Sequence, residues 1–538
     1  MFDELRKSLF IAPSKGAIFK NVFDRETFKK EHQSTSENDC TVYTSTGNIF
    51  LDDFASLSGY IRKRNISDIF QTMCDLYKEN PLLALKETGY LRLITRKSVL
   101  VDGTKLTTQR GQGLKFEYII RLIWLAINHE DVFVKNMDAF FAIGSYKDFI
   151  EMMRYDAFYN TKAAFNWDII LEATKRWLNN DQTADLVKKY LPKIRCKRQC
   201  HTLREQANSI IGKAIAHKLY PTMAKEFAYN EYRKLKSSGK AHVWQKLITQ
   251  GRYNEIDWST VPGRALNKLV TGKFLNNHNL SASYMEWIDK QPVAKFTGYP
   301  YELLENNYCT VYQEKTINKQ FMQLVKNAPA TTEPFIVCLD TSYSMTSLVT
   351  KNYTALQIAV SMAIYFSYLL KGIFENTFLE FSKTTEIRKW CGDTPLDKVN
   401  NTKYSHACGN TDVLSVARLL VKLKKTYPNE SFPTGALIIS DGEFDYTRSR
   451  PPLEVFKNIL ATAFDKEFVD NFKLVLWDVR GGSPVFESLY DEPNYFYMGG
   501  LDPSGLAFLM NKGKNSPKTA EELFNAAMDQ DLLDILCD

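Results

Sequence analysis

"FIVCLDTSYSM", residues 335–345, indicates how the second half of this 538-residue chain folds. Its first five residues are apolar, and they are followed at once by Asp340 and by two hydroxyl residues, Ser342 and Ser344. A continuous apolar run of this length is typical of a strand that is buried on both faces of a parallel sheet. Alternate residues of an extended segment point to the same side, so the three side-chain oxygens are expected to converge just beyond the strand.

The rest of the second half alternates short apolar runs with amphipathic stretches. Strands are predicted at 335–340, 376–382, 435–440, 473–479 and 494–498, and helices at 354–370, 412–425, 452–463, 503–511 and 519–536. This alternation predicts an α/β domain with a doubly wound, Rossmann-like parallel sheet. Ligands of such sheets bind outside the carboxyl ends of the strands, where Asp340 is expected to lie.

Further oxygen donors follow other predicted elements of this domain. Thr411 and Asp412 lie in "GNTDV", and Asp441 follows the strand in "LIISDGEFD". Carboxylates, hydroxyls and waters make the hard oxygen site that Mg²⁺ prefers, and the lack of His and Cys in the set argues against Zn²⁺. The pattern predicts a site for Mg²⁺ or another divalent cation.

The order of these residues resembles the metal-ion-dependent adhesion site of von Willebrand factor A domains. The matching pieces are Asp340-Thr-Ser342-Tyr-Ser344, then Thr411, then Asp441. The resemblance implies that Asp340 ligates the cation directly and that Ser342 and Ser344 add hydroxyls. Thr411 would complete the shell, and Asp441 would act through water.

The first half of the chain has a helical apolar period. Stretches such as "FEYIIRLIWLAINHE" (116–130) and "WDIILEATKRWLNN" (167–180) repeat this pattern from about residue 50 to 290. Successive antiparallel helices predict a HEAT-like helical repeat. The expected division is a polar arm at 1–49, a helical domain at 50–329 and the α/β domain at 330–538, with "NAPATTEP" (327–334) as the linker.

Charge is distributed unevenly along the chain. Residues 1–330 contain 49 basic and 35 acidic side chains, whereas residues 331–538 contain 20 basic and 27 acidic ones. The densest basic stretch, 188–273, has 19 basic and 5 acidic residues. Such an excess suits a polyanionic partner, with nucleic acid as the first candidate. The alternative, a solvated helical surface without a specific partner, stays open.

A glycine-rich turn in the helical half resembles that of TROVE-domain proteins, the Ro ribonucleoprotein autoantigen family. It carries Arg110, Gly111, Gly113 and Glu117 ahead of an aromatic-rich helix with Trp124, and "GSYKDFI" (144–150) resembles the family's Gly-aromatic-Asp helix start. The resemblance implies a ring or horseshoe of helices closed by a von Willebrand A domain. It also implies a scaffold that holds single-stranded ends of RNA and small structured RNA, whether non-coding or misfolded.

The residues expected to contact RNA share a basic or glycine-rich setting; they are Arg110, Gly111, Gly113, Arg195, Lys197, Arg198, Arg204 and Lys213. Basic side chains engage phosphates without reading sequence. Aromatic residues among them, Tyr190, Trp244, Tyr253 and Trp258, are candidates to stack unpaired bases, with core packing as the alternative for each.

The sequence gives little support to an enzymatic function. The chain has no phosphate-binding P-loop and no GxSxG elbow, and Ser342 stands where a haloacid-dehalogenase phosphatase needs a second Asp. Glu443 and Asp445 are the only local candidates for the general base of a metal-dependent hydrolase. We therefore expect a binding protein rather than an enzyme.

A different class of binding function also stays open. The metal site could bind an acidic residue of a partner protein, with the helices as a protein-docking surface. The N-terminus lacks a signal peptide, and the apolar stretch 359–370 is too short to span a bilayer. We expect a cytoplasmic monomer that does not enter a membrane.

Overall fold

The computed structural model describes residues 31–35, 41–56, 65–94, 96–159, 165–239, 242–271, 273–304, 310–328, 335–349, 352–381, 384–402, 412–440, 452–479, 493–500, 509 and 517–538. These residues form two compact units. Unit 1 takes in the described residues within 64–242 and 528–538, and unit 2 takes in those within 21–63 and 243–527. Each unit is therefore built from segments that are far apart in the sequence.

Unit 1 consists mainly of helices. They are α4 (Ile66–Glu79), α5 (Pro81–Arg92), α6 (Lys115–Asn128), α7 (Glu130–Lys135), α8 (Met137–Ile143), α9 (Tyr146–Tyr159), α10 (Trp167–Leu178), α11 (Ala184–Tyr190), α12 (Leu203–Leu219) and α13 (Lys225–Ser237). Capping boxes begin α4 and α12, where Asn65 and Thr202 satisfy backbone N–H groups that have no partner within the helix. The prediction of a largely helical first half is confirmed, except for a hairpin formed by β3 (Arg96–Val99) and β4 (Lys105–Gln109).

The C-terminal segment 528–538 belongs to unit 1. The Gln530 amide accepts a hydrogen bond from the backbone N–H of Arg110 at 2.7 Å and donates one to its carbonyl at 3.1 Å. Leu532, Leu533 and Leu536 are buried. The helix predicted over 519–536 is wrong beyond Met528, where α25 (Ala520–Met528) ends. The leucines after it have helical spacing, but this segment forms turns and its leucines are buried. Tertiary packing therefore overrides the helical periodicity of the sequence.

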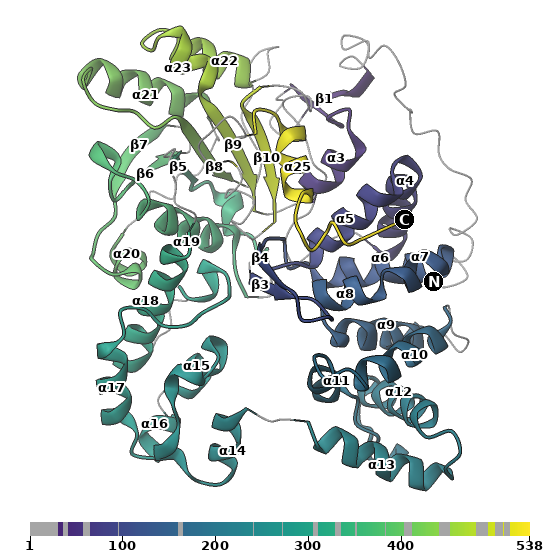
Figure 1. Cartoon of the computed structure of the whole chain (residues 1–538). Helices are drawn as coiled ribbons and strands as arrows, with labels where there is room; N and C mark the ends of the chain where they lie inside the picture. Colours follow the sequence, from purple (N-terminus) through teal and green to yellow (C-terminus); the bar gives the residue numbers. More distant parts are fainter. Residues whose placement is uncertain are drawn as a thin grey trace. The chain divides into compact units, whose positions relative to one another are not determined.

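Unit 2 contains a six-stranded sheet with the order β10-β9-β8-β5-β6-β7 (Figure 1). The strands are β5 (Phe335–Asp340), β6 (Thr377–Phe381), β7 (Thr385–Lys389), β8 (Gly435–Ser440), β9 (Lys473–Asp478) and β10 (Tyr495–Gly499). All neighbours are parallel except β6 and β7. All five predicted strands are present, and the missed strand, β7, is an edge strand with no buried residue.

Helices cover both faces of this sheet. Ile336 and Cys338 of β5 join one core with α21 (Leu414–Thr426) and α22 (Pro452–Leu460), whereas Val337 and Leu339 join another with α19 (Ala355–Ser367). The predicted α/β domain is confirmed by this arrangement. The helix predicted at 503–511 lies almost entirely outside the described residues.

The remaining elements of unit 2 come mostly from earlier in the chain. They are β1 (Gln33–Thr35), β2 (Thr41–Tyr43), α3 (Ile49–Ser56), α14 (Val243–Thr249), α15 (Gly263–Leu269), α16 (Lys273–Asn277), α17 (Ser281–Lys290) and α18 (Val311–Lys326), with α20 (Pro395–Asn401) and α23 (Lys466–Asn471) from the sheet region. Ile317 and Phe321 of α18 share a core with β5 and α19. Residues 329–334, most of the expected linker, lie outside the described residues. In the part of the chain that the structure describes, no helix is long and apolar enough to cross a membrane.

Candidate functional site

The two central strands of the sheet, β5 and β8, lie on either side of a topological switch point. The strand that follows β5 in the chain, β6, pairs on one side of it, whereas β9 pairs with β8 on the other side. The connections after β5 and β8 therefore leave in opposite directions. In open α/β sheets such a switch point is where ligands bind. Asp340 is the last residue of β5, and Ser440 is the last residue of β8.

The carboxylate of Asp340 is fully buried at this point and is held at both oxygens. Its Oδ1 accepts a hydrogen bond from the backbone N–H of Ser342 at 2.8 Å, and its Oδ2 accepts one from the hydroxyl of Ser440 at 2.6 Å. The Oγ atoms of Ser342 and Ser344 lie 3.0 Å apart. The structure thus brings together three of the five residues predicted to bind metal, Asp340, Ser342 and Ser344. The other two, Thr411 and Asp441, lie outside the described residues.

The chemistry of this donor set fits a hard divalent cation. Each carboxylate oxygen can accept more than one interaction, so Asp340 keeps lone pairs for a cation besides its two hydrogen bonds. The serine hydroxyls add neutral oxygen donors, as Mg²⁺ and Ca²⁺ prefer. Among the described residues no group of three or more His, Cys, Asp and Glu side chains could hold a metal ion. A cation at this place would be coordinated by one carboxylate among the described residues and by hydroxyls.

Two neighbours of the predicted set have roles that the sequence did not single out. Asp412 caps the start of α21, because its Oδ1 accepts from the N–H of Leu414 at 3.0 Å while its Oδ2 pairs with Arg418 at 2.6 Å. Ser440 orients Asp340 through the hydrogen bond from its hydroxyl. The only local signal was a hydroxyl residue that ends an apolar strand just before Asp441.

The glycine-rich turn of unit 1 packs against the end of α5. Backbone N–H groups of Gln112, Gly113 and Leu114 donate to the carbonyls of Tyr90, Leu93 and Leu91 at 3.1, 2.7 and 2.6 Å. Carbonyls at a helix end lack partners within the helix, so the turn satisfies them. A Cβ on Gly111 would lie 2.3 Å from the Tyr90 carbonyl oxygen, and Gly113 has φ +67°. These glycines serve the packing of the turn, and their contact with RNA stays a prediction.

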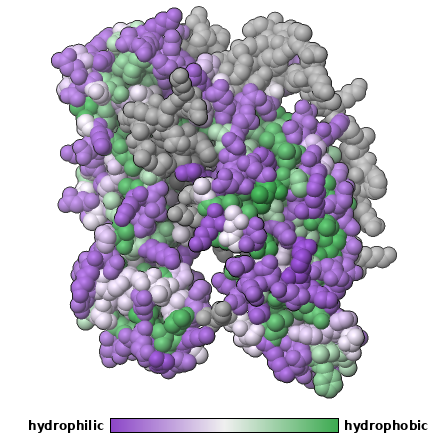
Figure 2. Space-filling model, viewed as in Figure 1, coloured by the Kyte–Doolittle hydropathy of each residue, from purple (hydrophilic) through white to green (hydrophobic). Residues whose placement is uncertain are grey.

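The other residues predicted to contact RNA lie around α12. Arg195 forms an ion pair with Glu205, whereas Arg198 is exposed and Lys213 is half-buried. Only the backbone of Lys197 is described, and it begins a short 3-10 turn. Between residues 184 and 239 the sequence has thirteen Lys and Arg residues against four acidic ones. Figure 2 shows hydrophilic side chains with interspersed apolar ones over α12 and α13, at the lower right of the view. In this part of the basic stretch predicted at 188–273, most basic residues therefore lie on helices.

The aromatic candidates for base stacking mostly pack within the protein. Trp258 is buried and contacts Tyr284 edge-on, with ring centroids 5.0 Å apart. Tyr253 stacks on His278 at 3.7 Å, and Trp244 packs beside the same core. For Trp258 the alternative of core packing, which the sequence left open, is the one observed.

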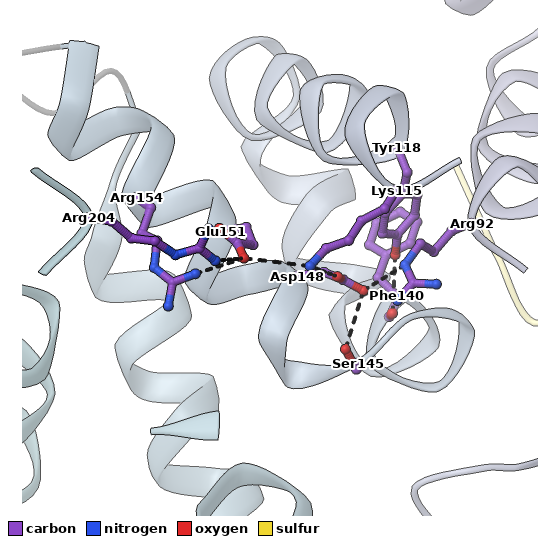
Figure 3. A network of polar contacts seen from close by, with 9 residues as sticks. All are labelled: Arg92, Lys115, Tyr118, Phe140, Ser145, Asp148, Glu151, Arg154 and Arg204. Atoms are coloured by element: carbon purple, nitrogen blue, oxygen red, sulfur yellow. Dashed lines mark hydrogen bonds and ion pairs between the residues drawn. The ribbon is translucent and has the colours of Figure 1, made fainter. Parts of the chain in front are cut away.

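Arg204 belongs to a network of ion pairs that joins four helices (Figure 3). Glu151 of α9 contacts Arg154 at 2.7 Å, Arg204 of α12 at 3.0 Å and Lys115 of α6 at 3.7 Å. Asp148, one turn earlier, contacts Lys115 at 3.3 Å and Arg92 of α5 at 2.9 Å. Figure 3 shows both carboxylates between these cations.

Burial and charge shift two pKa values in this network. Burial lowers the pKa of Lys115, although the carboxylates of Asp148 and Glu151 act in the opposite direction. Burial alone would raise the pKa of Glu151. The hydrogen bond from Arg154 and the positive charges around it outweigh burial, so the pKa of Glu151 is lowered.

Comparison with known proteins finds a family model that matches only part of the chain. A family model described as a domain of unknown function, DUF7788, matches residues 335–532, which is less than half of the chain. No curated protein matches the sequence. Among solved structures, the Ro (RSR) protein of Deinococcus radiodurans is similar at 10% identity and a TM-score of 0.36, over 89% of this chain and 99% of that one. A likeness at this TM-score is too weak to establish a shared fold.

Proposed function

We propose that this protein is an RNA-binding scaffold of a small-RNA ribonucleoprotein. Its helical part would bind RNA phosphates through a basic surface, and its α/β domain would be a von Willebrand A domain with a divalent cation. The observation that carries the proposal is the stretch 184–239, with thirteen basic and four acidic residues. Because this stretch folds into packed helices, the excess charge is fixed in space rather than spread along a disordered tail.

Several cations of this surface are available to a ligand. Lys193, Arg198 and Lys225 are all exposed. Each lies near the start of a helix or in a connection, on segments that pack around α12. Neutralising several phosphates releases counterions from the nucleic acid, and this release supplies affinity without sequence specificity. The scaffold would therefore hold single-stranded ends or structured RNA mainly through electrostatic attraction to the phosphates.

The cation site of the α/β domain is the second part of the proposal. Asp340 would ligate Mg²⁺ or another divalent cation, with the hydroxyls of Ser342 and Ser344, while Thr411 and Asp441 complete the set. A bound cation would supply a Lewis-acidic centre that accepts a further oxygen ligand. Ser440 would keep the carboxylate of Asp340 oriented by its 2.6 Å hydrogen bond. In this proposal the protein binds and does not catalyse.

A second candidate function uses the cation site for a protein partner. Ser344 is half-buried and the intervening Tyr343 is 75% exposed, so the rim of the site lies at the surface of unit 2. A carboxylate from an acidic residue of a partner could then complete the coordination of the cation. This function predicts binding that is lost with a chelator and with Asp340→Ala, whereas RNA binding by the helices would survive both.

A salt titration of the purified full-length protein tests the leading proposal. Affinity for a labelled single-stranded RNA is measured by fluorescence anisotropy between about 50 and about 200 mM KCl, where binding through six phosphates should weaken about three hundredfold. Asp340→Ala serves as the control that removes the cation site and spares the basic helices. Absence of RNA binding at the lowest salt, in both proteins, would contradict the proposal.

A further inference from the structure

The ion-pair network of Figure 3 carries more positive than negative charge. Around the two carboxylates of Asp148 and Glu151 lie four cations, Arg92, Lys115, Arg154 and Arg204. A fifth, Lys147, is exposed and close enough for its charge to act on Lys115. The cluster therefore has an excess of three positive charges.

The carboxylates are less exposed than two of the cations. Asp148 and Glu151 have 1% and 14% of their side-chain surface exposed, and Arg92 and Arg154 are similarly buried, whereas Lys115 has 32% and Arg204 has 59% exposed. A ligand that approaches this surface meets ammonium and guanidinium groups and little carboxylate. Partial burial also weakens the screening of these charges by water and salt, so an anion would be attracted more strongly than at an open surface.

An exposed aromatic ring lies beside these cations. Phe116, next to Lys115 at the start of α6, is 43% exposed, and its ring contacts that of Tyr155 on α9 edge-on at 5.8 Å. Glu151 and Tyr155 are four residues apart on α9 and so lie on the same face of that helix. Because Lys115 contacts the first and Phe116 contacts the second, the aromatic pair lies about one helical turn from the cluster.

A cation beside an exposed aromatic ring matches the two chemical parts of an unpaired nucleotide. Phosphates bind Lys and Arg, and a base can stack on an aromatic ring only if it is not already paired and stacked in a helix. The spacing of one helical turn is close to the distance between a base and its own phosphate. A free phosphate ion would use the cations but would leave Phe116 without a role.

We propose that the surface formed by Lys115, Phe116, Lys147 and Arg204 is a binding site for an unpaired RNA nucleotide, with its phosphate on the cations and its base on Phe116. This site rests on the proposed RNA-binding function and assigns it a specific location on α6, α9 and α12. Only Arg204 belongs to the set expected from the sequence. The others were missed because their charges and ring meet through contacts between separate helices.

The test compares two variants of the full-length protein with matched controls. Arg204→Gln removes an exposed cation, and Arg176→Gln is its control, because Arg176 of α10 is also 59% exposed and also forms an ion pair, with Asp138 at 2.6 Å. Phe116→Ala removes the exposed ring, and Tyr427→Ala is its control, because Tyr427 is 49% exposed and lies in unit 2. Circular dichroism melts verify that all four variants fold.

Affinity is measured by anisotropy for a labelled oligouridylate of about twelve nucleotides and for a blunt RNA duplex of similar length. We expect Phe116→Ala to weaken binding of the single strand about tenfold and to leave the duplex unchanged. We expect Arg204→Gln to weaken binding of the single strand and to reduce the salt slope by about one. The two control variants should bind as the wild type does.

Each outcome bears on a different statement. If the wild type binds RNA and both site variants bind the single strand as tightly as the wild type does, the proposed nucleotide site is wrong and the proposed function stands. If Phe116→Ala weakens duplex and single strand alike, the assignment to an unpaired base is wrong. If the wild type binds neither RNA at low salt, the proposed function fails and this site fails with it.

Discussion

The hydroxyl of Ser440 donates a hydrogen bond of 2.6 Å to Oδ2 of Asp340, across one hundred residues of sequence. It joins the ends of β8 and β5, the two strands that flank the switch point of the sheet. The bond fixes the orientation of a fully buried carboxylate. Any ligand that Asp340 binds at this switch point therefore meets a carboxylate that is already positioned.

Ser440→Ala should affect both stability and cation binding. Loss of a hydrogen bond to a buried carboxylate should lower the free energy of unfolding by about 2 kcal/mol. Affinity for Mn²⁺, used as a probe of the divalent site, should fall about tenfold because Asp340 loses the hydrogen bond that orients it. Chemical denaturation and paramagnetic Mn²⁺ titration measure the two effects.

Ser361→Ala provides the matched control for this prediction. Ser361 is also a buried serine of unit 2, but its Oγ donates to the Ile358 carbonyl within α19 at 2.7 Å. We expect a smaller loss of stability and unchanged Mn²⁺ affinity. Equal Mn²⁺ affinity in wild type and Ser440→Ala would remove the role assigned to Ser440.

Gly111→Ala should destabilise unit 1. The added Cβ would lie 2.3 Å from the Tyr90 carbonyl oxygen and 2.4 Å from the Leu93 Cβ, so the turn must move away from α5. Overpacking of this kind should cost about 3 kcal/mol. Gly103→Ala in the same unit is the control: its φ of +91° strains an alanine, but the nearest atom to a Cβ is 3.8 Å away, so the cost should be about 1 kcal/mol. If thermal melts show the same loss of stability in both variants, the packing described for this turn would be contradicted.

Leu533→Ala tests whether the C-terminal segment is part of the core of unit 1. Leu533 is fully buried, and its Cδ2 would lie 2.7 Å from a Cβ placed on Gly89. Truncating such a side chain should cost about 3 kcal/mol through lost burial and a residual cavity. Ile535→Ala is the control two residues on, where the side chain is 38% exposed. Denaturation curves that coincide for the two variants would show that the segment does not pack as described.

Lys398 should make stability depend on pH in the alkaline range. It is 4% exposed, its Nζ lies 3.7 Å from the centroid of the Tyr368 ring, and burial lowers its pKa to about 8. Between pH 8 and the unfolded value of 10.5 the unfolded state binds more protons than the folded state, so stability should rise with pH. Lys398→Met should remove this rise. A series of melts from pH 7 to 10 measures the difference between the two proteins, and parallel curves would contradict the assignment.

The sequence predicted the α/β domain well because its signals are local. The apolar runs of β5, β8 and β9 are each continuous and each end in a polar residue, so strand limits could be predicted to within a residue. The edge strand β7 was missed because its residues are exposed or half-exposed and carry no apolar pattern. The contacts among Asp340, Ser342 and Ser344 were predictable for the same reason, since the three residues lie within five positions of the sequence.

Relationships between distant segments were not predictable in this way. Ser440 contacts Asp340 only because β8 pairs with β5, and Gln530 contacts Arg110 across 420 residues. The cluster of Lys115, Arg154 and Arg204 likewise depends on how three helices pack. A basic stretch in a sequence indicates an excess of charge, but only the packed structure specifies which cations remain at the surface and which are neutralised by carboxylates.

Purification of the native protein without nuclease, followed by extraction of its nucleic acid, tests directly whether the protein binds RNA. We expect a defined RNA that stays with the protein at low salt and dissociates at high salt, because the contacts are mainly to phosphates. Asp340→Ala should retain this RNA. A preparation free of nucleic acid that also fails to bind added single-stranded or hairpin RNA at low salt would contradict the claim.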